Sequence, residues 1–128
     1  MQVAEQLSIF LENKPGVLAR VCHALAEAGV NLRAMCVSDT VDHAVVRLIP
    51  DDSPKARDVL EKGGALVVET DVLCVPVQDR PGILAGMAEK MSTADVNIEY
   101  AYGSTDSDGK GMLVLRVSDL EVARKALG

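Results

Sequence analysis

Two short polar loops, 66 residues apart, carry the groups best suited to hold a small molecule. The first, residues 13–16, reads NKPG, and the second, residues 79–82, reads DRPG. In each, Pro-Gly opens a helix, and the free N–H groups of a helix's first turn carry partial positive charge. Glycine also lets a ligand carboxylate approach the backbone closely. Gly16 and Gly82 are therefore candidate contacts for an anion.

A free amino acid also carries an ammonium group, which needs oxygen partners. Asn13 and Asn31 offer them in the first half of the chain, and Asp79 and Asn97 offer them in the second. The two sites are not equivalent, because a carboxylate at position 79 would repel a ligand carboxylate and attract an ammonium group. The chemistry of both loops thus suits a ligand with a carboxylate and an amine.

Each of these features also has a structural explanation. Pro-Gly makes a turn between a strand and a helix in proteins of any function. Asn31 and Asn97 can satisfy backbone groups where a strand begins. Lys14 and Arg80 fit solvated loop cations better than ligand contacts.

The loops belong to a longer internal repeat. Residues 7–32 align without a gap to residues 73–98. A repeat of this length indicates two copies of one fold unit. We expect a first domain of residues 1–70 and a second of residues 71–128.

The first copy has the hydrophobic pattern of a mixed α and β unit. Residues 65–78 are long enough to close the first copy and open the second. The resulting βαββαβ order predicts a ferredoxin-like α+β fold, with helices on one face of an antiparallel sheet. The predicted elements are a strand near residues 7–11, a helix that Pro15 opens and Gly29 ends, strands at 31–38 and 44–49 joined by a turn around Asp39 to Asp42, and a helix that starts at 51–54 and stops at 63–64.

The second copy stops one strand short of the first. Its predicted elements are a helix at 81–93, strands at 96–102 and 112–117, and a helix at 119–127. The missing strand leaves an unpaired edge, which residues 1–5 or a strand of a second chain can cover. An apolar sheet face away from the helices would also need cover, and the alternation assigns to it Phe10, Met35, Val37, Val45 and Ile49.

The two loops and their surroundings resemble the ACT domain family. The shared pattern is Asn or Asp two residues before Pro-Gly, then Val or Ile and Leu, with Val-Asn at the next strand, and it occurs twice over nearly the whole chain. The resemblance implies tandem regulatory modules without catalytic activity, which bind an amino acid or another small ligand near the interface between two modules. It implies these ligand contacts: Asn13, Pro15, Gly16, Val17, Leu18, Asn31, Asp79, Pro81, Gly82, Ile83, Leu84 and Asn97.

One departure from the family limits what can be said of the ligand. The His found two residues before the first Asn in serine-binding members is Leu11 here and Val77 in the second copy, so serine specificity does not carry over. We expect an amino-acid ligand, a homodimer and a metabolic enzyme as the regulated partner. The alternative is a ligand-free scaffold for dimerisation or interaction.

The composition argues against other classes of protein. A net charge of −6, with two Tyr, one Phe and no Trp, provides neither the basic surface nor the stacking residues of nucleic-acid binding. No apolar run approaches the roughly 20 residues of a membrane span, and the first residues lack the layout of a secretory signal, so we expect a cytoplasmic protein without membrane contact. The three Cys and two His form no metal-binding or catalytic pattern. We therefore expect neither a cofactor nor an enzymatic activity.

Overall fold

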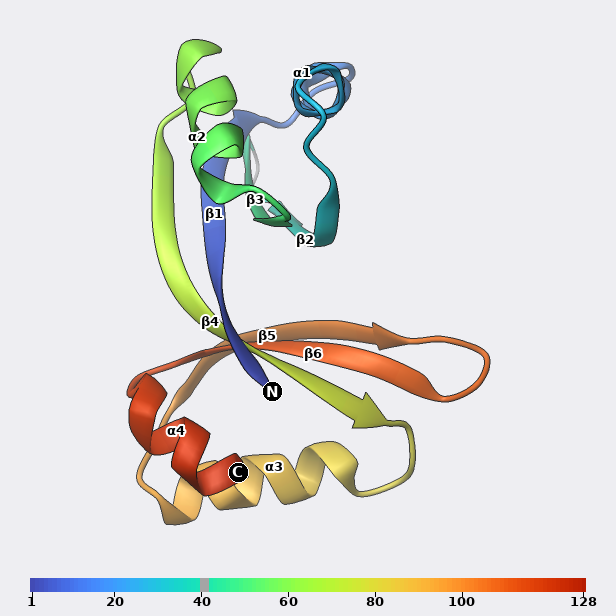
Figure 1. Ribbon diagram of the computed structural model, residues 1–128, viewed down its shortest axis with the longest axis vertical. Coiled ribbons are helices and arrows are strands. Elements are labelled where there is room, and N and C mark those ends of the chain that lie inside the picture. Colours follow the sequence, from blue (N-terminus) through green and yellow to red (C-terminus); the bar gives the residue numbers. More distant parts are fainter. Residues whose placement is uncertain (40–41) are drawn as a thin grey trace. The chain divides into compact units, whose positions relative to one another are not determined.

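The computed structural model describes residues 1–39 and 42–128, which fold into two compact units of helices and antiparallel strands (Figure 1). The first unit is Glu5–Thr70, and the second is Asp71–Gly128 together with Met1–Ala4. These units differ from the expected domains only in the place of the first four residues. The division into separable domains at residue 70 stays a prediction.

In the first unit, β3 lies between β1 and β2 and runs antiparallel to both. The beginning of β4, which neighbours β1, supplies the fourth strand. Part of the turn expected around Asp39 to Asp42 lies outside the described residues. The elements are β1 (Gln2–Glu12), α1 (Val17–Glu27), β2 (Leu32–Asp39), β3 (His43–Pro50), α2 (Ser53–Lys62) and β4 (Val67–Gln78).

The core of the first unit lies between the sheet and its two helices. Leu7 and Ile9 of β1 pair across the sheet with Leu48 and Val46 of β3, and all four are buried. They form one hydrophobic cluster with residues of both helices, among them Leu25 of α1. Burying an aliphatic side chain of this size contributes about 1.5–3 kcal/mol. The core thus fixes both helices on one face of the sheet.

A β-bulge near the start of β2 overturns part of the predicted apolar face. The register of β2 against β3 shifts there, and the extra residue reverses the alternation of side chains. Met35 therefore lies opposite the core residue Leu48, and Val37 lies opposite Val46. The prediction that Met35 and Val37 point away from the helices was wrong, because it assumed strict alternation and did not allow for an extra residue.

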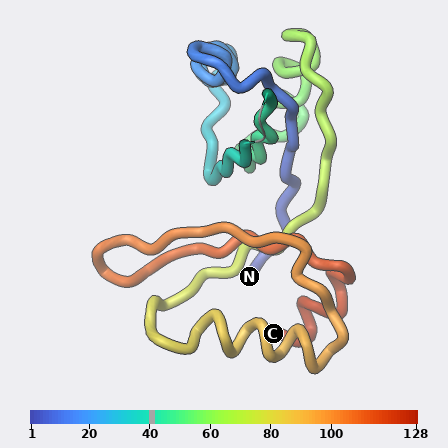
Figure 2. Tube along the Cα trace, turned by 180° about the vertical axis from the view of Figure 1, so that it is seen from behind, coloured from blue at the N-terminus to red at the C-terminus, as the bar shows by residue number. Residues whose placement is uncertain are grey.

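The second unit repeats the plan, with β6 between β4 and β5. Both of its helices lie on the same side of these strands, as Figures 1 and 2 show. Within residues 71–128 the structure has no strand after the last helix, as predicted, and Met1–Ala4, which include the start of β1, join this unit instead. Of the two candidates for the missing strand, the chain's own N-terminus is the one observed. The further elements are α3 (Ile83–Thr93), β5 (Ile98–Thr105), β6 (Lys110–Val117) and α4 (Leu120–Leu127).

Helices α1 and α3 end in the same left-handed turn, built from different residues. Gly29 adopts φ 77° after α1, whereas Asp95 adopts φ 57° after α3. Among the described residues, Asp95 is the one non-glycine residue with positive φ. Its carboxylate also lies at a helix C-terminus, where the backbone carbonyls carry partial negative charge.

The variant Asp95→Gly should raise the free energy of unfolding by about 1 kcal/mol, because glycine adopts this conformation without strain and removes the unfavourable charge. Urea denaturation monitored by circular dichroism measures the change. The reciprocal variant Gly29→Asp should destabilise the first unit by a similar amount. An unchanged or lower stability of Asp95→Gly would contradict the prediction.

Candidate functional site

The first Pro-Gly loop forms a tight turn at the start of α1. The N–H of Val17 donates to the carbonyl of Lys14 at 3.4 Å, and Gly16 has φ 87° and ψ −16°. These angles are those of the third residue of a type II turn, which requires positive φ, and Pro15 fits the second position. The sequence predicted Pro15 within the helix start. It instead precedes the N-cap, which is Gly16.

The second loop repeats this geometry. The N–H of Ile83 donates to the carbonyl of Arg80 at 3.3 Å, and Gly82 has φ 93° and ψ −7°. The carbonyl of Gly82 then accepts the first helical bond, from the N–H of Gly86 at 2.9 Å. Both copies therefore present the same backbone surface, a glycine N-cap followed by the first turn of a helix.

The helices that follow the two loops begin without a side-chain cap, unlike the other two. In α2 the Asp52 carboxylate accepts from the N–H of Lys55 at 3.1 Å, and in α4 the Asp119 carboxylate accepts from the N–H of Val122 at 3.1 Å. Neither α1 nor α3 has such a bond. The N–H groups of Val17 and Ile83 donate within the turns, but those of the next two residues of each helix are open to an acceptor from outside the unit. The Asp-capped helices show that a carboxylate fits this role.

The loop residues lie at the surface of their units. Leu18 and Leu84, which follow the loops, have 38% and 61% of their surface exposed. Large apolar side chains beside open N–H groups form an amphipathic surface, which is the kind that a small ligand or a protein partner covers. Of the predicted contacts at the loops, Val17 and Ile83 are half-buried, and the exposed ones are Asn13, Pro15, Gly16, Leu18, Asp79, Pro81, Gly82 and Leu84.

Asn31 and Asn97 lie at the other end of the helices from the loops. The main chain of Asn31 exchanges hydrogen bonds with Asp51, at 3.0 Å to its carboxylate and 2.9 Å from its N–H. Asn97 does the same with Ser118, at 2.9 Å in both directions. In both pairs the side chain of the neighbour, Asp51 or Ser118, satisfies the backbone N–H of the Asn. These bonds are therefore not the expected ones, in which an Asn side chain would satisfy backbone groups.

The structure does not bring the two sets of predicted contacts together within one unit. Helix α1 has eleven residues and so separates Gly16 from Asn31 by about 16 Å. The same holds for Gly82 and Asn97, on either side of α3. A site with both a Pro-Gly loop and the Asn of the following strand therefore needs two modules, each giving one end.

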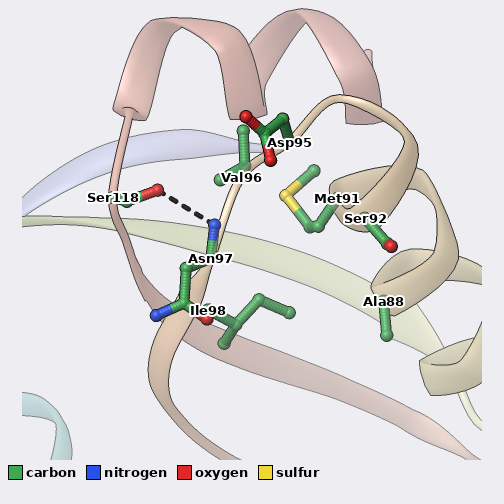
Figure 3. Close-up of a pocket in the computed structure, with 8 residues that line it drawn as sticks. All are labelled: Ala88, Met91, Ser92, Asp95, Val96, Asn97, Ile98 and Ser118. Atoms are coloured by element: carbon green, nitrogen blue, oxygen red, sulfur yellow. Dashed lines mark hydrogen bonds between the residues drawn. The ribbon is translucent and has the colours of Figure 1, made fainter.

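The second unit has a cavity at its Asn97 end. It measures about 430 Å³, and Asn97 is the one predicted contact that lines it. Figure 3 shows Met91 in its middle, with Asp95 and Ser92 on opposite sides and the Asn97 main chain bonded to Ser118. Asp95 and Ser118 could not be predicted as lining residues from the sequence, because their position depends on the pairing of distant strands.

A second cavity, of about 440 Å³, lies in the first unit beside loop one. Of the predicted contacts, Val17 alone lines it, together with residues of β1, α1 and α2. Two charged residues on its wall, Glu12 and Arg20, were not among the predicted contacts. Their position follows from the packing of α1 beside α2, which the sequence alone does not show.

Loop one carries an ion pair. The Lys14 ammonium lies 2.8 Å from the Glu12 carboxylate. The hydrogen bond from Lys14 and its positive charge lower the pKa of Glu12 below 4.5, and His43 and Arg20 contribute in the same direction. Glu12 is therefore a carboxylate at neutral pH, beside loop one.

The variant Lys14→Met should raise the pKa of Glu12, because the main cause of its depression is removed. In the wild type the lowered folded pKa stabilises the fold above the unfolded pKa, and this stabilisation is lost as pH falls through the folded pKa. NMR titration of the Glu12 carboxyl group measures the shift. Lys62→Met is the control, since Lys62 pairs with Asp58 at 2.9 Å. Equal Glu12 titration curves in both variants would refute the assignment.

Other kinds of site find no support in the described part of the chain. Within residues 1–39 and 42–128, no group of three or more His, Cys, Asp or Glu side chains could hold a metal ion. Over the same residues, no helix is long and apolar enough to cross a membrane. In the β5–β6 loop the Asp106 carboxylate accepts from the N–H groups of Asp108 and Lys110, which makes it part of the turn.

Several solved structures share this fold, with different sequence identities to this chain. A protein from Bacteroides thetaiotaomicron is 36% identical with a TM-score of 0.91, over 98% of this chain and 86% of that one. The ligand-free regulatory subunit of aspartate kinase from Thermus thermophilus is 19% identical with a TM-score of 0.75, over 99% and 95%. E. coli aspartokinase III, in complex with lysine and aspartate, is 13% identical with a TM-score of 0.58, over 98% and 31%.

The two aspartate kinase structures are too distant in sequence to show more than the common fold. No curated protein sequence matches the chain. The ACT domain pair family, however, matches residues 1–127. Together with the doubled βαββα plan and the 36% identical relative, this confirms the resemblance of the loops. The chain belongs to the ACT domain pair family.

Proposed function

We propose that this chain is a non-catalytic regulatory protein that binds a free amino acid at its Pro-Gly loops, near interfaces between ACT modules. The observation that carries the proposal is the contrast among helix starts. The two helices behind the loops begin at glycine and lack a side-chain cap, whereas Asp52 and Asp119 cap the other two. A ligand carboxylate would supply at the loops what these aspartates supply elsewhere.

Each site would draw on two modules. The N–H groups at Gly16 would bind the ligand carboxylate, and Asn13 would accept from its ammonium group. Because Asn31 lies a helix length away, the second Asn would come from a neighbouring module. In loop two Asp79 would favour the ammonium group, with Asn97 at the far end of its unit. The remaining contacts would form the apolar rims of the two loops: Pro15, Val17, Leu18, Pro81, Ile83 and Leu84.

The need for two modules supports a homodimer with the modules of residues 1–70 and 71–128 as its binding units. Ligand binding would stabilise the interface and so report the amino acid to a partner, for which we propose a metabolic enzyme in the cytoplasm. The descriptions of two structurally similar proteins support this proposal. The Thermus thermophilus protein is a regulatory subunit of aspartate kinase, and E. coli aspartokinase III was solved with lysine and aspartate.

A thermal-melt screen against the twenty amino acids, with size-exclusion chromatography for each hit, tests the proposal. One amino acid should stabilise the protein in a saturable manner, by about 2.7 kcal/mol at a hundredfold excess over its dissociation constant. A flat panel of melting temperatures would refute amino-acid binding.

A ligand-free scaffold is the second candidate, and the outer strand β2 favours it. Met35 and Val37 on this strand have 41% and 46% of their surface exposed, on an edge that can pair with another strand. The scaffold function predicts a constant oligomer whose size and melting temperature ignore every amino acid.

A further inference from the structure

The cavity of about 440 Å³ in the first unit lies directly behind loop one. Val17, the first helical residue after Gly16, forms part of its wall, followed at helical spacing by Val21 and Ala24. Val59 of α2 is among the residues that complete an aliphatic lining. The volume falls within the roughly 300–1,000 Å³ of small-molecule sites. The cavity can thus receive an aliphatic group from a ligand bound at the loop.

Two opposite charges accompany this aliphatic lining. Glu12, the last residue of β1, and Arg20, one helical turn after Gly16, both line the cavity. Within residues 1–39 and 42–128, no hydrogen bond or ion pair engages the Arg20 guanidinium. Glu12 pairs with Lys14, but both side chains are more than half exposed, and an exposed pair of this kind contributes little. A ligand ammonium can therefore replace Lys14 at Glu12.

The second copy lacks both charges at the matching positions. Gln78 stands where the first copy has Glu12, and Gly86 stands where it has Arg20. Position 24 is Ala, whereas its counterpart is Lys90. The surface hollow beside α3 that includes Gly86 and Lys90 is otherwise lined by Glu89, Thr93, Ala94 and Ala126, without a Val, Leu or Ile. The combination of a zwitterion-binding pair and an aliphatic cavity is therefore particular to the first unit.

We propose that the first unit binds a free amino acid with a branched aliphatic side chain, which enters this cavity. The ligand carboxylate binds Arg20 and the N–H groups of Leu18 and Ala19, which follow the turn, and the ammonium group binds Glu12 beside Asn13. A guanidinium presents two parallel donors to a carboxylate, which fixes the ligand's orientation. This inference rests on the proposed function, because it names the ligand class of loop one.

Isothermal titration calorimetry of the full chain tests the ligand class. L-Leucine, L-isoleucine or L-valine should bind at least tenfold more tightly than L-serine or L-aspartate. 4-Methylpentanoate, which lacks the ammonium group, and 3-methylbutylamine, which lacks the carboxylate, should each bind at least tenfold more weakly than L-leucine. Equal binding of either analogue, or a preference for a polar amino acid, would overturn the inference.

Filling the cavity provides the test by mutation. Ala24→Leu should reduce the affinity for the preferred aliphatic amino acid at least tenfold, because the new side chain occupies the cavity. Ala26→Leu is the matched control, since Ala26 lies on the same exposed helix but does not line the cavity. Arg20→Gln and Glu12→Gln should each weaken binding, with thermal melts of the ligand-free variants to verify folding. Unchanged affinity in Ala24→Leu would overturn the inference.

The outcomes separate this inference from the function on which it rests. If a polar amino acid binds and Gly16→Val abolishes its binding, loop one is a site, the proposed function stands and the aliphatic ligand class is wrong. If no amino acid binds the wild-type chain, both fail.

Discussion

Valine in place of Gly16 is expected to reduce amino-acid affinity at loop one at least a hundredfold in a protein that still folds. A hundredfold loss corresponds to about 2.7 kcal/mol of binding free energy. A Cβ at Gly16 would meet nothing within 4 Å, so the new side chain projects into the space through which a ligand carboxylate must approach. The positive φ of 87° adds strain of about 1–3 kcal/mol, which the fold must tolerate. Gly82→Val should act in the same way on loop two.

The strain at Gly16 calls for a control that carries the same strain elsewhere. Gly29 has φ 77°, and a Cβ there would meet Lys55 Nζ alone among its neighbours, at 3.8 Å. Gly29→Val should therefore lower the stability to a similar degree and leave ligand affinity intact. Calorimetric titration of both variants, with urea denaturation beside it, distinguishes the two effects. Full affinity in Gly16→Val and in Gly82→Val would show that the ligand binds elsewhere.

The order of helices and strands could be predicted from the sequence because its signals are local. Leu7 and Ile9 lie on either side of Ser8 in an alternating pattern, and both are buried in the structure. The strand that completes the second unit could not be predicted, because pairing between distant segments has no local signal in the sequence. The N-terminal residues Met1–Ala4 take that place, ahead of the first repeat.

The strict alternation of residues also gave a wrong prediction for the sheet face away from the helices. An extra residue near the start of β2 moves Met35 and Val37 to the helix side of the sheet. The same shift occurs near the start of β5, so the bulge is part of the repeated plan. The alternation of residues 31–38 does not indicate the bulge, because the bulge becomes apparent only from the pairing of β2 with β3.

The candidate site was predictable where the backbone defines it. Gly16 and Gly82 adopt the positive φ that their Pro-Gly context predicts. The grouping of Asn13 with Asn31 came from the family resemblance, and the structure shows that a helix of eleven residues separates them. Arg20 could not be assigned, because its place at the cavity depends on how α1 packs beside α2.

Alanine in place of Gly111 is expected to lower the free energy of unfolding by about 3 kcal/mol, near the upper end of what single substitutions do. A Cβ there would overlap the backbone oxygen of Ser104 and lie 2.7 Å from Cγ2 of Thr105. Thr105 lies directly opposite Gly111 in the β5–β6 ladder, so the backbone of the hairpin has to move. Urea denaturation followed by circular dichroism measures the loss.

The same displacement should reach loop two, because the N–H of Asp79 donates to the carbonyl of Gly109 at 2.6 Å. Gly111→Ala is therefore expected to weaken any ligand of loop two and to leave loop one unchanged. Gly86→Ala is the matched control in the same unit: a Cβ there meets nothing within 4 Å, and alanine favours a helix interior by about 0.5–1 kcal/mol. The two glycine-to-alanine changes should shift stability in opposite directions. If Gly111→Ala lowers the free energy of unfolding by less than about 1 kcal/mol, the hairpin backbone moves at a lower cost than its packing implies, and the prediction is wrong.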